Sequence, residues 1–213
     1  LYREVYSISQ WREINVLPTE NYKLMNDLDF SNEGKESLIT NPYTGVLDGG
    51  NHTIRNLRIE SIDSGLIKYL RGTVKNLYID NFNQTINIKS SYAGLISDAN
   101  NVSEIDNVHI QNAKIELGNS SEIYAGILVG IGRGKVQNCS VQNGKVSTIS
   151  EVNRLDLGGL VGISSNATIR NSYVLDIELE ISKALIVNGI GGLVGTNSGI
   201  IQYSYSEGKI KTV

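Results

Sequence analysis

The chain has 213 residues, of which 40% are hydrophobic and 19% charged, and its net charge at pH 7 is -3. The sequence has no stripe of basic residues of the kind that binding to a phosphate backbone requires. Nucleic acid is therefore not an expected partner, and no run approaches the roughly 18 apolar residues of a membrane span. The single cysteine, Cys139, excludes an internal disulfide and a cysteine-cluster metal site, and no cofactor is expected in this chain.

The first thirty residues differ in pattern from the rest of the chain. Ser7 followed by Gln10 resembles a capping box, and three apolar side chains then fall on one helical face: Ile8, Trp11 and Ile14. We expect a short amphipathic helix, with Trp11 as a structural residue, that covers an otherwise exposed strand edge. Residues 22–30 are predicted as the first strand. The predicted organisation is thus an N-terminal cap over residues 1–30 and one further structural unit over residues 31–213.

Two short phrases repeat through this second unit. A glycine of a G-L-V-G phrase recurs at spacings of 20, 29, 32, 33 and 33 residues: Gly45, Gly65, Gly94, Gly126, Gly159 and Gly192. A phrase of apolar-x-Asn-x-x-apolar type follows it at similar spacings: Asn56, Asn76, Asn107, Asn138, Asn171 and then Tyr203. Two landmarks that keep a common period are typical of a solenoid.

Each repeat predicts strands rather than helices. Runs of Val, Ile, Leu and Tyr alternate with Gly, Asn and Ser turns, and helical periodicity is absent from the repeats. A period of about 30 residues fits three short strands per coil. The predicted fold is all-β: a right-handed parallel β-helix of about five to six coils with a short N-terminal capping helix, its handedness following the rule for parallel crossovers.

The recurring residues are assigned structural roles. Gly126, Gly159 and Gly192 are expected to allow tight corners and close approach between coils. The recurring asparagines are expected to form a ladder in which each side-chain amide bonds to its neighbour one coil away, with a binding role as the alternative. The chain begins without Met and stops at Val213 partway through a repeat, which predicts a piece cut from a longer protein.

Candidate binding residues come from the most variable segments. In solenoids such segments often gather on one binding face, and here they follow the asparagine phrases: residues 80–91, 111–122, 142–157 and 175–189. Tyr92 and Tyr124 precede equivalent Ala-Gly pairs, so they should stack one above the other. They are either a partner-contacting aromatic pair or a structural ladder.

The sequence assigns no catalytic or metal-binding residue. Asp27 and Asp29 lie two apart on a predicted strand and so share a face, and with Asp48 they suggest a Ca²⁺ or sugar site; the alternative is that they satisfy backbone donors at turns. Cys139 lies within a repeat phrase and is predicted to be a small buried hydrophobic residue. Residues 130–135 are predicted as a turn, because the spacing of a phosphate-binding loop and its following helix are missing.

The repeats resemble the GLUG motif family. Gly159-Leu160-Val161-Gly162 followed by Ile169-Arg170-Asn171-Ser172-Tyr173 is close to its pattern, whereas Tyr203 replaces the usual Asn in the next copy. The upstream stretch from Tyr22 to Leu57 is similar to the block that precedes such repeats in secreted bacterial proteins. Those proteins include the streptococcal immunoglobulin A protease family, which are zinc metallopeptidases, and surface adhesins.

This resemblance implies a non-catalytic module of a secreted or cell-wall-attached bacterial protein, a spacer or substrate-recognition domain of an immunoglobulin A-type zinc metallopeptidase. The family's zinc site is an H-E-x-x-H helix, and no such motif occurs here, so its chemistry is carried onto no residue. The expected partners are a host protein such as immunoglobulin A or a glycan, together with other domains of the same chain. Two alternatives stay open: an adhesin module, and a carbohydrate-active β-helix enzyme.

Overall fold

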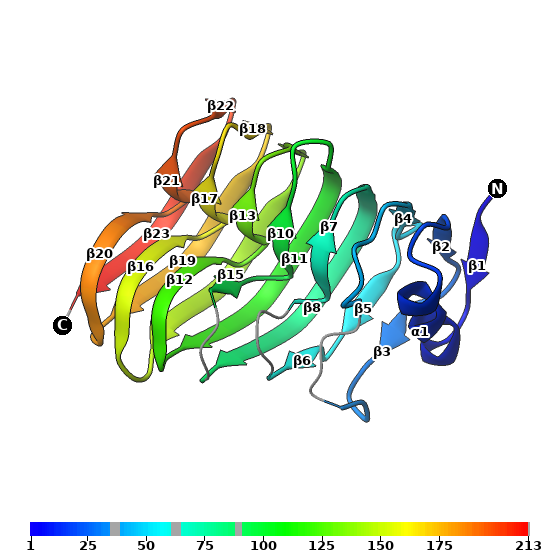
Figure 1. The fold of residues 1–213 in the computed structure, drawn as a ribbon, viewed down its shortest axis with the longest axis horizontal. Helices are drawn as coiled ribbons and strands as arrows, with labels where there is room; N and C mark the ends of the chain where they lie inside the picture. Colours follow the sequence, from blue (N-terminus) through cyan, green and yellow to red (C-terminus); the bar gives the residue numbers. More distant parts are fainter. Residues whose placement is uncertain (35–38, 61–64, 88–90, 213) are drawn as a thin grey trace.

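Apolar side chains at every second position, interrupted by turn residues at a fixed period, produce a stack of parallel coils (Figure 1). The structure, a computed structural model, describes residues 1–34, 39–60, 65–87 and 91–212. It is a parallel β-helix of about five turns with one short helix, as the repeats predict.

The described strands form three parallel sheets. The largest sheet has 14 strands: β1 Arg3–Val5, β2 Tyr22–Leu24, β3 Leu28–Asp29, β4 Val46–Asp48, β5 Thr53–Arg55, β6 Arg58–Ile59, β8 Thr73–Ile86, β11 Glu104–Leu117, β14 Lys135–Gln137, β15 Ser140–Thr148, β18 Thr168–Arg170, β19 Tyr173–Ile181, β22 Ile200–Gln202 and β23 Tyr205–Thr212. The second sheet comprises β7 Ile67–Leu70, β10 Ile96–Ala99, β13 Val129–Gly132, β17 Val161–Ser164 and β21 Val194–Asn197. The third comprises β9 Tyr92–Ala93, β12 Ser120–Gly126, β16 Val152–Gly158 and β20 Ala184–Gly191.

The core is a set of apolar columns that run from coil to coil. One column places a fully buried aliphatic side chain in each successive coil: Leu47, Val74, Ile105, Val136 and Ile169. Burial of each such side chain contributes about 1.5–3 kcal/mol, so the stacked coils stabilise one another although no single coil has a core of its own.

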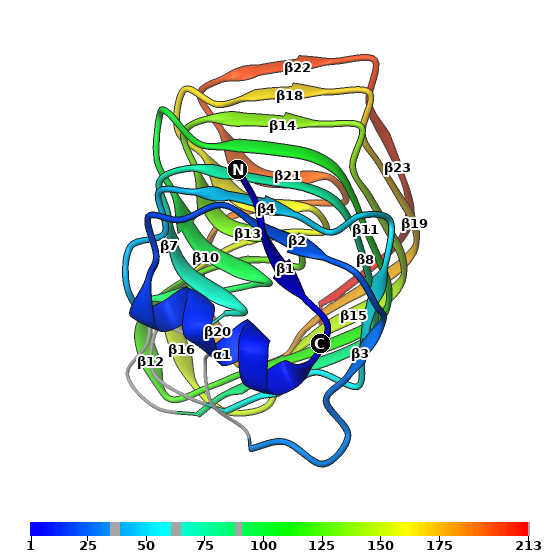
Figure 2. The ribbon, with the colours of Figure 1, turned by 90° about the vertical axis from the view of Figure 1, so that its right-hand side faces the viewer.

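The predicted capping helix is α1, Ile8–Val16. Ser7 is its N-cap and accepts a hydrogen bond from the backbone N–H of Gln10. Trp11 and Ile14 are completely buried, and the Trp11 ring meets Phe30 edge-on at 6.3 Å between centroids. Figure 2 shows α1 and β1 lying across the N-terminal end of the coils, where they cover the apolar interior.

The predicted first strand differs from the structure. Residues 22–30 form two short strands, β2 and β3, and β1 precedes them and pairs with β2. Both β2 and β3 are hydrogen-bonded into the large sheet through β4 and β5. Residues 22–30 are therefore part of the solenoid, and α1 is the element of residues 1–30 that lies outside the large sheet.

The asparagines occupy corners with left-handed backbone conformation. One column has φ between 47° and 56°: Asn76, Asn107, Asn138, Asn171 and Tyr203. A second column has φ between 52° and 59°: Asn56, Asn81, Asn112, Asn143 and Asp176. Asn and Asp tolerate this region better than other residues with side chains, which explains their recurrence at these corners.

One recurring asparagine and two recurring glycines occupy other positions in the coils than their spacing in the sequence predicts. Asn56 lies in the second column, because two more residues separate Asp48 from Thr53 than separate their partners Lys75 and Tyr78. Among the glycines, Gly126 pairs with Gly158, and Gly158 pairs with Gly191. Gly159 and Gly192 therefore align with Ile127, one position beyond the column to which they were assigned.

The glycine column has the predicted steric role. A Cβ atom on Gly126 would collide with the carbonyl oxygen of Val129 and with the backbone of Val161 in the next coil. Only glycine fits where the chain approaches itself this closely.

The variable segments consist mostly of strands rather than loops, which corrects that part of the expectation. Residues 111–117 continue β11, and β12 begins at Ser120. Residues 142–157 and 175–189 likewise consist mostly of β15 with β16 and of β19 with β20. Their sequences vary because they alternate buried and exposed positions without glycine landmarks. Within the segment 80–91, residues 88–90 lie outside the described residues.

Candidate functional site

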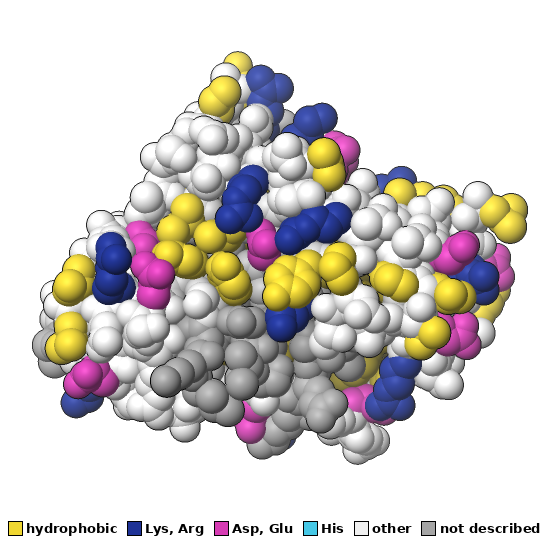
Figure 3. All heavy atoms as spheres, viewed as in Figure 1, with side chains coloured by type: hydrophobic (Ala, Val, Ile, Leu, Met, Phe, Trp, Pro, Cys, Tyr) yellow, Lys and Arg dark blue, Asp and Glu magenta, His cyan; other side chains and the backbone are white. Residues whose placement is uncertain are grey.

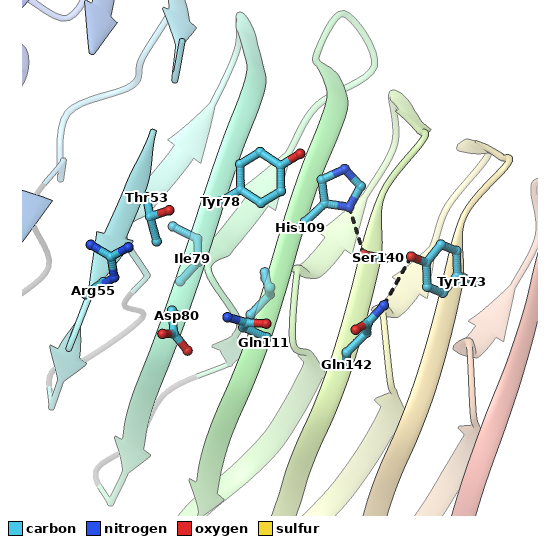
Figure 4. Close-up of a pocket in the computed structure, with 11 residues that line it drawn as sticks. Thr53, Arg55, Tyr78, Ile79, Asp80, His109, Gln111, Ser140, Gln142 and Tyr173 are labelled. Carbon is cyan, nitrogen blue, oxygen red and sulfur yellow. Dashed lines mark hydrogen bonds between the residues drawn. The ribbon is translucent and has the colours of Figure 1, made fainter. Parts of the chain in front are cut away.

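A surface hollow lies on the outer face of the large sheet, between the two columns of left-handed corners (Figure 4). It has a volume of about 330 Å³ and crosses five strands: β5, β8, β11, β15 and β19. Four of these strands contribute two outward side chains each, and β19 contributes Tyr173; together they form an aromatic row and a polar row. We call this hollow the groove.

The aromatic row runs along the solenoid axis, one residue per coil. Thr53, Tyr78, His109, Ser140 and Tyr173 are successive register partners, and Tyr205 follows. The rings of Tyr78 and His109 lie 5.0 Å apart, and those of Tyr173 and Tyr205 stack at 5.5 Å with an interplanar angle of 11°. The small Ser140 side chain separates the two ring pairs, which opens the row at its centre.

The polar row lies beside it and combines two amides with one compensated charge pair. Arg55 donates to the Asp27 carboxylate at 2.8 Å, and Asp80 accepts from Asn112 at 2.8 Å. The Gln142 amide donates to the Tyr173 hydroxyl at 3.1 Å. Gln111 is exposed, and its side chain makes no hydrogen bond to any residue in the described part of the chain.

A relay of hydrogen bonds fixes the state of the His109 ring. Asp48 accepts from Asn76 Nδ2 at 3.1 Å, so Asn76 turns its Oδ1 toward Asn107 Nδ2, which donates at 3.0 Å. Asn107 Oδ1 then faces His109 Nε2 at 2.8 Å, and this nitrogen must carry the proton. His109 Nδ1 is left to accept from the Ser140 hydroxyl at 2.8 Å.

The ring of His109 is neutral as well as oriented. Burial lowers the pKa of His109 below its ordinary value of 6.5, because the charged form would lose solvation. The groove therefore presents an uncharged imidazole beside the Tyr78 ring near pH 7.

Ser140 and His109 have the hydrogen bond of a nucleophile and its base, yet the surroundings do not fit acyl transfer. Ser140 is only 3% exposed. Its strand pairs on both sides, with β11 and with β19, so the neighbouring backbone N–H groups are used in the ladder rather than directed at a reacting oxyanion. The pair instead shapes the floor of the groove.

The asparagine ladder is present as two separate columns. In the first, Asn107 donates to Asn76, and Asn171 donates to Asn138 at 3.4 Å. Asn138 itself donates to Asp106 at 2.8 Å, so the ladder changes partner between coils. In the second column, Asn81 donates to Asn56 at 2.7 Å.

The three carboxylates singled out in the sequence occupy structural positions. Asp27 accepts from the backbone N–H of Thr53 at 2.9 Å, and this bond is the main cause of its lowered pKa. Asp29 accepts from Asn56 and from the backbone of Ser31, which lower its pKa. Asp48 anchors the relay described above. Among the described residues, no three His, Cys, Asp or Glu side chains gather as a metal site.

Tyr92 and Tyr124 stack across coils as predicted, but outside the groove. They are register partners on β9 and β12, and their rings lie 5.9 Å apart at 45°. Burial and the neighbouring Glu122 raise the pKa of Tyr124 to about 12. The groove residues themselves were missed in the sequence, because Tyr78, His109, Ser140 and Tyr173 come together only through the register.

Two further sequence expectations concern isolated residues. Cys139 is fully buried, and burial raises the pKa of its thiol to about 12, so it behaves as a buried hydrophobic residue. In the stretch 130–135, the chain leaves β13 at Gly132 and enters β14 at Lys135, so only its middle is a turn. Arg133 in that turn donates to Asp98 at 2.6 Å.

The face formed by β7, β10 and β13 shows no large patch of one charge. Figure 3 shows hydrophobic, basic and acidic side chains interspersed on this side of the molecule. Arg71 and Arg133 both pair with Asp98, which offsets one of their two positive charges. Within the described ranges, no helix has the length and apolar character needed to cross a membrane.

Comparison with known proteins relates this chain to a segment of immunoglobulin A1 proteases. It is 30% identical over 201 residues to the immunoglobulin A1 protease of Streptococcus sanguinis, a match that covers 88% of this chain and 10% of that protein. The chain thus spans only a small part of the curated relative that it matches. No protein-family model matches the chain.

Two solved structures share the fold. An IgA1 protease structure superposes with a TM-score of 0.68 at 22% identity and covers 98% of this chain and 16% of that chain. A Bacteroides ovatus protein described as a candidate immunoglobulin A1 protease superposes with a TM-score of 0.60 at 17% identity, over 98% of this chain and 76% of that one. The chain is a β-solenoid domain related to the immunoglobulin A1 proteases, in agreement with the resemblance of its repeats.

Proposed function

We propose that this domain is a non-catalytic recognition module of an immunoglobulin A1 protease-like protein, and that the groove is its contact surface. The observation that carries the proposal is the groove itself, in which aromatic and amide side chains from the four strands β8, β11, β15 and β19 face outward. Exposed aromatic residues backed by a rigid sheet are typical of surfaces that bind partners.

The relationship to immunoglobulin A1 proteases supports the antibody as the partner. In this proposal the peptide bond is cleaved by a catalytic domain elsewhere in the protein, and the solenoid holds the substrate. The parent protein is secreted or attached to the bacterial surface, where it meets the antibody. The carboxylates of this domain support a non-catalytic role, because Asp27, Asp29 and Asp48 are all engaged in holding corners of the solenoid.

A rigid spacer is the second candidate function. It is favoured by the continuous ladder of parallel pairs from β8 to β23, in which each coil is fixed to the next. A spacer keeps its flanking domains at a fixed distance without binding anything itself.

Binding of the 213-residue chain to purified immunoglobulin A1, measured by biolayer interferometry, distinguishes these functions. Saturable binding that weakens in Tyr173→Ala and survives in Tyr124→Ala would support recognition through the groove. Tyr124 is the matched control, because it is also a half-buried tyrosine in a cross-coil ring pair. Absence of binding to both the antibody and glycans would refute the recognition proposal and favour the spacer, whereas glycan binding without antibody binding would favour an adhesin.

A further inference from the structure

We propose that the groove binds a neutral oligosaccharide chain, laid along the solenoid axis across β8, β11, β15 and β19. The inference rests on the proposed recognition function and adds the chemical class of the ligand. It is argued from the charge, the backbone pairing and the side-chain chemistry of the groove.

The described lining offers no unpaired cation to an anionic ligand. Its single guanidinium, Arg55, is paired with Asp27 at 2.8 Å, and its single carboxylate, Asp80, accepts from Asn112. The relay holds the His109 ring in place, and burial lowers the pKa of His109 below its ordinary value, so the ring is neutral near pH 7. A phosphate, a sulfated chain or a nucleic acid would therefore lose its solvation without gaining a counter-charge.

The backbone of the groove is also closed to an extended peptide. Each of β8, β11, β15 and β19 pairs with a strand on both sides, so its N–H and C=O groups are already used in the sheet. A peptide could not add as a further strand here, which removes the main-chain hydrogen bonds that usually give such binding its affinity. Recognition must come from side chains.

The available side chains match the two faces of a sugar. A pyranose ring presents C–H groups on its flat face, which pack against aromatic rings, and hydroxyl groups at its edge. Tyr78 with His109 and Tyr173 with Tyr205 supply two ring pairs, separated by the opening over Ser140. Beside them the amides of Gln111 and Gln142 can each donate and accept, as vicinal hydroxyls require.

The spacing favours a chain over a single sugar. Tyr78 and Tyr173 lie three strands apart, which is about 14 Å at the usual spacing of hydrogen-bonded strands. Both ring pairs can be reached at once only by an oligosaccharide that follows the axis. Gln111, exposed and unpaired within the described residues, then lies beside the middle of the chain.

The test uses isothermal titration calorimetry of the intact 213-residue chain with cellotetraose, N-acetylchitotetraose and mannotetraose, each compared with its monosaccharide. We expect at least one tetrasaccharide to bind with an affinity about tenfold or more above that of its monosaccharide. The affinity should not change between about 0.05 and 0.5 M NaCl, because salt screens interactions between charges and the sugar carries none. The side-chain amide signals of Gln111 and Gln142 should shift in NMR spectra on binding.

Matched variants assign the contacts. Tyr173→Ala should weaken binding about tenfold, whereas Tyr173→Phe, which keeps the ring, should stay within about threefold. Gln111→Ala should weaken binding about fivefold without affecting folding, because this side chain is exposed, and the control Gln137→Ala, on the other side of the asparagine column, should have no effect.

The outcomes separate this inference from the proposed function. Antibody binding that requires the groove, together with no binding of any of the three tetrasaccharides, would overturn the glycan inference and leave the recognition function standing. Tetrasaccharide binding unaffected by Tyr173→Ala and Gln111→Ala would also overturn it, since the sugar would bind elsewhere. Groove-dependent tetrasaccharide binding without antibody binding would support the inference and refute the antibody as the partner.

Discussion

Replacement of Asn107 tests how much the ladder and its left-handed corner stabilise the solenoid. The Asn107 amide donates to Asn76 at 3.0 Å and accepts from His109 at 2.8 Å, and its φ is 56°. Asn107→Ala removes two hydrogen bonds of about 0.5–1.5 kcal/mol each and replaces a residue that tolerates positive φ by one for which this conformation costs about 1–2 kcal/mol. The expected loss in the free energy of unfolding is about 2–5 kcal/mol.

Asn107→Gly separates these two contributions. Glycine adopts positive φ without strain, so this variant loses the hydrogen bonds and keeps the corner. We expect it to be about 1 kcal/mol more stable than Asn107→Ala and still less stable than the wild type. Gln111→Ala, an exposed position on the same strand, serves as the control and should change stability by less than about 0.5 kcal/mol.

The assay is urea unfolding at pH 7.5, followed by circular dichroism, with the slope of the transition compared between variants. If Asn107→Gly were as stable as the wild type, the side-chain ladder would contribute nothing and the argument would fail. If Asn107→Ala and Asn107→Gly were equally stable, the corner would impose no conformational cost.

Three further predictions concern other parts of the chain. Tyr203 has φ of 51° and is largely exposed, so Tyr203→Asn should raise the free energy of unfolding, measured with urea, by about 0.5–1 kcal/mol. A loss of stability would show that packing of the Tyr203 ring stabilises the fold. Because burial lowers the pKa of His109 below 6.5, the unfolded chain binds a proton at His109 more readily than the native chain, so stability should fall as the pH drops below 6.5. In thermal unfolding, His109→Gln should lack this decline. An unchanged decline in the variant would assign the pH dependence to another group. Trp11→Ala should lower the free energy of unfolding by about 3–5 kcal/mol. It should also speed amide hydrogen exchange in β1, β2 and β3 but not in β15 and β19. Uniform acceleration would mean that the coils unfold together rather than from the cap.

Periodicity made the architecture predictable. The glycine and asparagine phrases recur because each coil repeats the same corners, where a β-carbon collides at Gly126 and a left-handed turn favours Asn at position 107. The capping helix was predictable for a local reason, since Ser7 and the Ile8, Trp11, Ile14 face lie within one short segment. Such signals depend on neighbours in the sequence or on a fixed repeat length.

The residues that line the groove could not be predicted from the sequence. Tyr78, His109, Ser140 and Tyr173 differ in type, so they form no visible repeat, and only the parallel register lines them up on one face. The two extra residues between Asp48 and Thr53 moved Asn56 to another column, and the shift of one residue at Ile127 moved Gly159 and Gly192, although the spacing of the phrases looked regular.

The sequence by itself determined that this chain is a parallel β-helix with an N-terminal cap and that it is related to immunoglobulin A1 proteases. Only the tertiary structure decided which side chains share a surface and how the relay from Asp48 to Ser140 fixes the orientation and tautomer of the His109 ring. The physical reason is that the fold follows from the repeated burial of apolar residues, whereas the groove follows from the alignment of residues about 31 positions apart, which hydrogen bonding between coils alone establishes.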